Sequence, residues 1–214
     1  MKYLAVPKLP VVTEGKKMIA CIGDSITFGA GVRGKRELTW EYYLEKLLGK
    51  EHQVLNYGIS GRTLLSTGDY PYTEEKQYQH SRKVKADVYL IMLGTNDSKP
   101  YNWNEEMYRK ELSAFVKGYI SLNHAPEVVL MTPPSCFADP NIGVVGFDID
   151  QDIITDKICP IVNEIAGKYH LQIIDLHSFT GIHKEWFADG VHPNEEGNRQ
   201  IAAFIFREIN KENT

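Results

Sequence analysis

The chain has 214 residues, of which 43% are hydrophobic and 24% are charged, a balance typical of folded globular proteins and unlike that of disordered chains. Its formal net charge of -4 supplies no positive field for a polyanion, so we expect no nucleic-acid partner. No apolar stretch approaches the roughly 20 residues that cross a bilayer, so we expect no membrane span.

The length suits one domain built around a single hydrophobic core. We therefore predict one domain over residues 1–214, with residues 1–16 as an N-terminal extension. Pro7 and Pro10 interrupt this extension, and no continuous apolar run precedes a small-residue cleavage site. As written, the sequence predicts a cytoplasmic protein, although an exported chain trimmed of its signal peptide would look the same. The oligomeric state is not indicated.

Five short apolar segments, rich in β-formers, end in small or polar residues and are predicted to be strands. Consecutive apolar residues suit strands that are buried on both faces, as in a parallel sheet covered by helices. The predicted strands, in chain order, are residues 18–23, 53–57, 88–94, 128–132 and 171–175.

Apolar residues recur with helical period between and after these strands. Pro160 should kink or restart the third of the predicted helices. Pro193 and Asn194 form a good capping pair before the last one, and Glu195 and Glu196 favour the dipole of its first turn. The helical period covers residues 40–48, 108–119, 154–165 and 201–209.

This alternation of strands and helices predicts an α/β fold, with an open and mainly parallel sheet between two layers of helices. In such sheets the active site lies at the carboxyl ends of the strands. Residues 133–150 and 66–79 show no clear period. They are either loops that line this site or ordered surface loops.

Metal and disulfide chemistry are not indicated. Cys21, Cys136 and Cys159 are odd in number and fit no zinc or redox spacing, so we expect three reduced cysteines. No HExxH-like pair or Cys/His cluster is present, and we therefore expect no metal site.

Ser25 directly follows the first predicted strand, in Gly23-Asp24-Ser25-Ile26-Thr27. The glycine permits a tight turn, so the serine can present its hydroxyl and its own N–H at the edge of the sheet. This position suits a nucleophile. A helix cap or a phosphate-binding turn is the alternative interpretation, because small polar residues favour such turns.

Two further turns carry candidate hydrogen-bond donors. Gly58 follows the second strand in NYGISG and could offer an unobstructed N–H, or be an ordinary turn glycine. Asn96 follows the third strand in GTND, where its side chain could donate to a developing oxyanion or form a local cap.

His192 stands before the last helix in DGVHPN, and Asp189 precedes it by three residues. A histidine held between a carboxylate and a proline-started helix has the properties of a general base. Asp175, at the end of the fifth strand, is the alternative acid. Asp24 and Asp97 are interpreted as structural turn residues, and the remaining histidines carry no motif.

Together these blocks resemble the SGNH hydrolases, also called GDSL esterases. That family carries a nucleophilic Ser in Gly-Asp-Ser, an oxyanion Gly, an oxyanion Asn in Gly-x-Asn-Asp, and Asp-x-x-His. Here the blocks read GDSIT, Gly58 of NYGISG, GTND and DGVHPN, in order over residues 23–194. Ile26 stands where the name-giving motif has leucine, a change that does not touch the chemistry.

The resemblance implies a flavodoxin-like three-layer α/β/α sandwich and ester hydrolysis through an acyl-enzyme, without a cofactor. Ser25 would be the nucleophile, His192 the base and Asp189 the acid that orients it. The N–H groups of Ser25 and Gly58 and the Asn96 amide would hold the oxyanion.

The phrase LGTNDSKPYNW and the short DGVHPN block resemble family members that are carbohydrate O-acetylesterases. Lysophospholipase and acyl-thioesterase activities are alternatives within the family. A sugar-binding protein that has lost catalysis is a third possibility, against which the intact Ser, Asn and His argue. A phosphate-binding flavodoxin-like module would need a more glycine-rich first turn than GDSIT.

Overall fold

The computed structural model describes residues 7–211, and their strands form one sheet. Its strands run in the order β2-β1-β3-β4-β5, and every neighbouring pair is parallel. This is the flavodoxin-like order of a doubly wound sheet. The predicted α/β fold is therefore confirmed. The strands are β1 (Lys17–Gly23), β2 (His52–Asn56), β3 (Val88–Met92), β4 (Glu127–Met131) and β5 (Gln172–Ile174).

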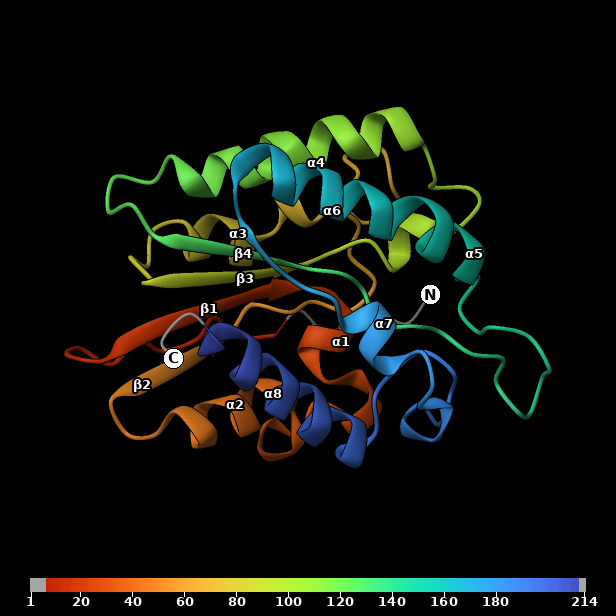
Figure 1. Cartoon of the computed structure of the whole chain (residues 1–214), viewed down its shortest axis with the longest axis horizontal. Coiled ribbons are helices and arrows are strands. Elements are labelled where there is room, and N and C mark those ends of the chain that lie inside the picture. Colours follow the sequence, from red (N-terminus) through yellow and green to blue (C-terminus); the bar gives the residue numbers. More distant parts are fainter. Residues whose placement is uncertain (1–6, 212–214) are drawn as a thin grey trace.

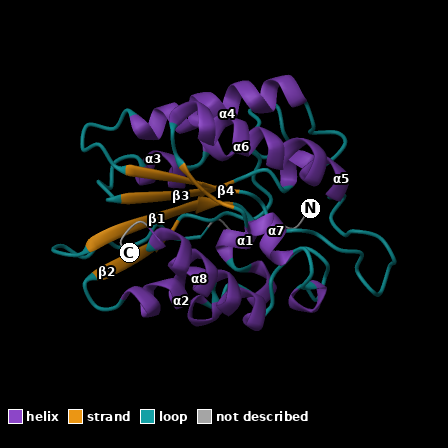
Figure 2. Cartoon of the chain, viewed as in Figure 1, coloured by secondary structure: helices purple, strands orange, loops and turns teal. Residues whose placement is uncertain are grey.

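Helices cover both faces of this sheet, as Figure 1 shows. One layer contains α3 (Lys76–Ser81), α4 (Glu105–Ile120) and α6 (Cys159–Tyr169). The opposite layer contains α2 (Trp40–Leu48) and α8 (Glu195–Ile209). Figure 2 shows the strands lying between the two layers of helices, which is the predicted three-layer sandwich.

The consecutive apolar residues of the strands divide between two cores. In β1, Ala20 and Ile22 pack into the core beneath α4 and α6, whereas Ile19 and Cys21 pack into the core beneath α2 and α8. Strands buried on both faces need apolar residues at successive positions, which explains the pattern. All three cysteines are buried and unpaired, as predicted.

The predicted helices are present, and two of them begin at a side-chain cap. Asn104 accepts from Met107 N–H at the start of α4, and Asn194 accepts from Gly197 N–H at the start of α8. Pro160 lies in the first turn of α6, directly after a π-helical turn (Ile154–Ile158). The missing N–H of proline makes the preceding hydrogen-bond pattern change, so the helix restarts at this point.

The two unpatterned segments differ in the structure. Residues 133–150 contain no helix or strand, as expected. The segment 66–79 instead contains a 3-10 turn (Tyr72–Glu74) and the start of α3. The buried residues of α3 are Gln77 and Ser81, so its inner face is polar and gives no hydrophobic period.

Short elements gather at the carboxyl ends of the strands and position the site. The short helices are α1 (Ser25–Phe28), α5 (Gln151–Ile153) and α7 (Leu176–Thr180), and the remaining 3-10 turns are Ala30–Val32, Arg36–Leu38, Asn96–Ser98 and Lys184–Trp186.

Among the described residues, no helix is long and apolar enough to cross a membrane.

Candidate active site

Ser25 is the first residue of α1, immediately beyond β1. The Asp24 side chain caps this helix, with Oδ1 accepting from Ile26 N–H at 2.9 Å. Gly29, with φ +87°, ends the helix after one turn. First-turn N–H groups have no acceptor within their own helix. Ser25 therefore presents a hydroxyl and an N–H at the carboxyl edge of the sheet.

His192 and Asp189 complete a hydrogen-bonded line with Ser25. His192 Nε2 lies 2.9 Å from Ser25 Oγ, and His192 Nδ1 lies 2.7 Å from Asp189 Oδ2. The second oxygen of Asp189 accepts from the N–H groups of Val191 and His192, at 3.0 and 2.7 Å. One tight turn thus fixes both the carboxylate and the imidazole. The structure brings the three predicted residues together.

The environment of Asp189 keeps it ionised. Burial opposes its charge, but the hydrogen bonds from the side chain and N–H of His192 outweigh burial and lower its pKa to about 2. A carboxylate that is charged at neutral pH favours a proton on Nδ1 of His192. Nε2 is then left as an acceptor for the Ser25 hydroxyl.

A cavity of about 350 Å³ opens over Ser25. Besides Ser25, Ala30 and Ile149, the residues that line this cavity fall into two groups. We call these the amide wall (Ser60, Gly61, Tyr70, Thr95, Asn96, Lys99) and the histidine wall (Phe147, Asp189, Val191, His192).

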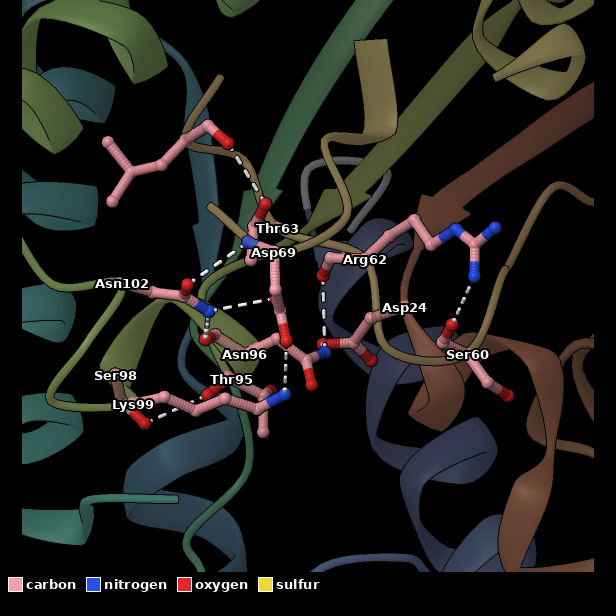
Figure 3. Close-up of polar contacts among 11 residues, drawn as sticks. Asp24, Ser60, Arg62, Thr63, Asp69, Thr95, Asn96, Ser98, Lys99 and Asn102 are labelled. Atoms are coloured by element: carbon pink, nitrogen blue, oxygen red, sulfur yellow. Dashed lines mark hydrogen bonds and ion pairs between the residues drawn. The ribbon is translucent and has the colours of Figure 1, made fainter. Parts of the chain in front are cut away.

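Asn96 lies in the amide wall with its side-chain nitrogen directed toward Asp24 and Arg62 (Figure 3). Its Nδ2 donates to Arg62 O at 3.1 Å and approaches Asp24 Oδ2 at 3.4 Å. The second distance is beyond the usual range for a good N–H···O bond. One hydrogen of the amide is therefore weakly held and can be donated to a ligand oxygen.

A polar network joins the two loops of the amide wall behind Asn96, as Figure 3 shows. Asn102 donates to the Asn96 carbonyl and to Asp69 Oδ1, both at 2.9 Å, and its Oδ1 accepts from Asp69 N–H at 3.0 Å. Lys99 Nζ lies 3.1 Å from Asp69 Oδ2. These contacts fix the backbone that carries the Asn96 amide.

Comparison with known proteins identifies the family of this chain. The model of the GDSL-like lipase/acylhydrolase family matches residues 21–200, which include both walls of the cavity. The chain belongs to this GDSL-like family. A relative from Xylanibacter ruminicola, named acetylxylan esterase, is 34% identical over 216 residues, which cover 92% of this chain and 44% of the relative. The chain thus spans less than half the length of that curated relative.

Solved structures of GDSL-like esterases share the fold. An aryl esterase of M. smegmatis has a TM-score of 0.72 at 22% identity, covering 90% of this chain and 98% of that one. A carbohydrate acetylesterase from Sinorhizobium meliloti has a TM-score of 0.70 at 20% identity, covering 91% and 98%. At such identities the likeness concerns the fold.

Two glycines of the NYGISG block have different surroundings. Gly58, expected as an oxyanion donor, does not line the cavity, and its N–H donates to Asn56 Oδ1 at 2.8 Å. A Cβ there would collide with the backbone of Phe28, so close packing of α1 explains this glycine. Gly61 lines the cavity at φ +81°, and within residues 7–211 its N–H has no acceptor. Pattern matching alone missed Gly61.

Asp175, the alternative acid, has other partners. Its carboxylate caps α7 by accepting from Ser178 N–H at 3.0 Å, and it also accepts from the hydroxyls of Ser178 and Thr132. It does not line the cavity. The structure therefore brings Asp189, and not Asp175, to His192.

Asp24 and Asp97 are buried beside the site. Burial raises the pKa of Asp24, partly offset by the N–H of Ile26. Burial also raises the pKa of Asp97 to about 7, although the N–H groups of Leu65 and Leu64 oppose the shift. Asp97 accepts from both of these groups, at 2.8 and 3.0 Å. Both carboxylates thus tie turns together, which matches their structural interpretation.

Within residues 7–211, no group of three or more His, Cys, Asp or Glu side chains could hold a metal ion. The histidines without a motif all lie outside the cavity lining: His52, His80, His124, His170, His177 and His183.

Proposed function

We propose that the chain is a serine esterase that removes O-acetyl groups from a carbohydrate through an acyl-enzyme. The observation that carries the proposal is the pair of hydrogen bonds that joins Asp189 to His192, at 2.7 Å, and His192 to Ser25, at 2.9 Å. All three residues line the cavity. A hydroxyl becomes an effective nucleophile when a base lies within hydrogen-bond reach and a third group orients that base.

In the proposed reaction, Ser25 Oγ attacks the acyl carbon while His192 Nε2 takes its proton. Ionised Asp189 stabilises the imidazolium that forms. The imidazolium then gives the proton to the oxygen of the leaving alcohol, and the carbon–oxygen bond of the ester breaks. Water, activated by the same nitrogen, attacks the acyl-enzyme and releases the acid and free Ser25. The scheme needs no cofactor.

In the proposed reaction, three N–H groups donate hydrogen bonds to the negative oxygen of the tetrahedral intermediate. Ser25 N–H lies at the positive end of α1, and Asn96 Nδ2 has one weakly held hydrogen. Gly61 lines the same cavity, and within residues 7–211 its N–H has no acceptor. Gly61 takes the role that the sequence pattern gave to Gly58, because the N–H of Gly58 already has an acceptor.

The acetylated sugar is favoured by two observations. The relative from Xylanibacter ruminicola is named for acetylxylan, and a solved neighbour is titled a carbohydrate acetylesterase. In addition, a cavity of about 350 Å³ is small, since ligand pockets range from about 300 to 1,000 Å³ and this one must hold the leaving group as well as the acyl group. This size favours a short acyl group over a long one.

The test is release of acetate from acetylated xylooligosaccharides. Ser25→Ala should fold normally and lose essentially all activity, whereas Ser121→Ala, on an exposed serine at the end of α4, should match the wild type. A fluorophosphonate probe should label Ser25 in the wild type. Labelling of another residue with Ser25 left free would reject the proposed nucleophile.

Acyl length provides the second test. Each additional buried methylene contributes about 0.8 kcal/mol, so an enzyme with a lipid-chain pocket would become steadily faster on longer esters. We expect kcat/KM to fall from acetate to octanoate. A steady rise would favour the lysophospholipase alternative.

A further inference from the structure

Phe147 is an exposed aromatic residue at the reacting centre. Its side chain is 57% exposed, yet it lines the cavity over Ser25. Its ring meets the His192 ring edge to face, with centroids 5.0 Å apart and planes at 76°. Its place in the cavity lining and its contact with His192, rather than its exposure, indicate a role toward a ligand.

The loop that carries Phe147 is anchored near both of its ends. Phe137 N–H donates to Gly190 O at 2.7 Å, and Asp150 N–H donates to Ser98 Oγ at 3.1 Å. Between these anchors, Phe147 and Asp148 both have left-handed backbones, with φ +64° and +60°. Bulky residues rarely adopt this conformation, and it persists where the surroundings impose it. The ring is thus held beside His192 at a cost in backbone strain.

The chemistry of the site locates the leaving group next to this ring. This step rests on the proposed function. The imidazolium of His192 must give its proton to the oxygen of the leaving alcohol, which therefore lies within about 3 Å of Nε2. Because Phe147 packs on the same imidazole, the alcohol part of a bound ester would come to lie beside Phe147.

The charges around the cavity favour a neutral alcohol. Lys99, the cation of the amide wall, lies 3.1 Å from Asp69, and the neighbouring Arg62 lies 2.6 Å from Glu75. Each positive charge is therefore balanced by its own carboxylate. Asp189 adds a negative charge on the other wall, which disfavours an anionic ring such as a uronic acid.

From these observations we propose that Phe147 is the platform on which the sugar ring of the leaving group stacks, and that this sugar is neutral. The apolar C–H face of a sugar ring can cover a flat aromatic ring while its hydroxyls stay in water. Phe147 then acts as a specificity residue, because it contacts the alcohol part of the substrate and leaves the acetyl part untouched.

The test compares two acetate esters that differ only in the alcohol: an acetylated xylooligosaccharide and ethyl acetate. Phe147→Ala should lower kcat/KM for the sugar ester about 10-fold more than it lowers kcat/KM for ethyl acetate, because only the sugar stacks on the ring. Phe147→Leu, which keeps apolar bulk without a flat face, should behave like Phe147→Ala, and Phe147→Trp should stay close to wild type. Ile142→Ala, on an exposed residue of the same loop outside the cavity lining, is the matched control.

Several results would overturn the role of Phe147. Equal losses on both esters would mean that it acts on His192, and full activity of Phe147→Leu on the sugar would mean that bulk suffices. A loss on phenyl acetate without a loss on the sugar ester would assign the platform to an aryl group. Failure of the wild type on every acetylated sugar would instead reject the proposed function.

Discussion

The two walls of the cavity are built in different ways. In the histidine wall, Asp189 and His192 are three residues apart, and one turn forms all of their mutual hydrogen bonds. In the amide wall, Asn96 is fixed by residues from a distant loop, through Arg62 O and through the Asp69–Asn102 pair. The first wall is a local structure, and the second depends on the pairing of two loops.

This difference determines how each wall should respond to substitution. A local turn can lose one side chain without moving the rest of the fold, so its variants should lose mainly chemistry, with a cost in stability confined to the hydrogen bonds of that turn. A network of buried polar groups behaves as a unit, because a partner left without its hydrogen bond carries the full cost of burial. Variants of the amide wall should therefore lose stability together with activity.

The largest effect is expected in the histidine wall. Asp189→Asn should reduce kcat by up to about 10,000-fold, because the amide can favour the wrong tautomer of His192 and no longer stabilises the imidazolium. Acetate release per folded molecule measures the loss, and the thermal midpoint checks that the fold is kept.

Asp175→Asn is the matched control for this change. It removes charge from the carboxylate that caps α7, so it should cost about 1 kcal/mol of stability and leave kcat near that of the wild type. If this variant is the more damaging to kcat, the acid has been assigned to the wrong residue, and the roles of Ser25 and His192 remain.

The next effect belongs to the amide wall. Asn96→Ala removes a proposed oxyanion donor, so kcat should fall by about 100- to 1000-fold, or about 2.7–4 kcal/mol, with a smaller change in KM. Asn163→Ala, which removes an exposed amide from α6, should leave kcat unchanged. Full activity of Asn96→Ala would exclude Asn96 from the mechanism.

The same contrast explains what the sequence could predict. Ser25, Asn96 and His192 each lie directly beyond a strand or before a helix, at positions that the doubly wound fold brings to one edge. Asp189 could be found because its contact with His192 is local. In contrast, the network of Asp69 joins residues about 30 positions apart, and nothing in either loop marks the other.

Other features were hidden for specific reasons. Gly58 and Gly61 belong to one short block, and only the packing of Gly58 against α1 shows which glycine is free to face the cavity. The helix α3 was missed because its buried positions, Gln77 and Ser81, are polar. Phe147 lies in a loop that the sequence left with two interpretations, a site-lining loop or an ordered surface loop. Its contact with His192 depends on a strained backbone that no pattern reveals.

A smaller effect should reveal the coupling within the amide wall. Asp69→Ala leaves Lys99 in a mostly buried position without its carboxylate and frees Asn102, so we expect a loss of about 1–3 kcal/mol in the free energy of unfolding and roughly a 10-fold loss in kcat. Adding Lys99→Met should restore part of the stability, because the unpaired charge is removed. Urea unfolding of both single variants and the double variant measures the coupling; additive losses would contradict it.

The last predicted effect concerns pH, and its sign differs between two carboxylates at the site, Asp189 in the histidine wall and Asp97 beside the cavity. The pKa of Asp189 is lowered from 3.8 to about 2, so its contribution to stability is present above pH 4 and is lost as pH falls toward 2. The pKa of Asp97 is raised from 3.8 to about 7, so its contribution is complete below pH 4 and is lost as pH rises toward 7.

The free energy of unfolding, measured in urea from pH 4 to 8, tests the second sign. Asp97 can impose a decline of at most about 1.4 kcal/mol per pH unit, which should level off above pH 7. Asp24 and Glu41 have raised pKa values as well and contribute in the same direction, so the readout is the difference between variant and wild type.

Asp97→Asn should lower stability at pH 4, because only one acceptor remains for Leu64 and Leu65, but its profile should be flatter between pH 4 and 7. Asp156→Asn, on an exposed residue, should reproduce the wild-type slope. A parallel profile for Asp97→Asn would show that Asp97 is ionised throughout, and that Asp97 does not lower stability as pH rises.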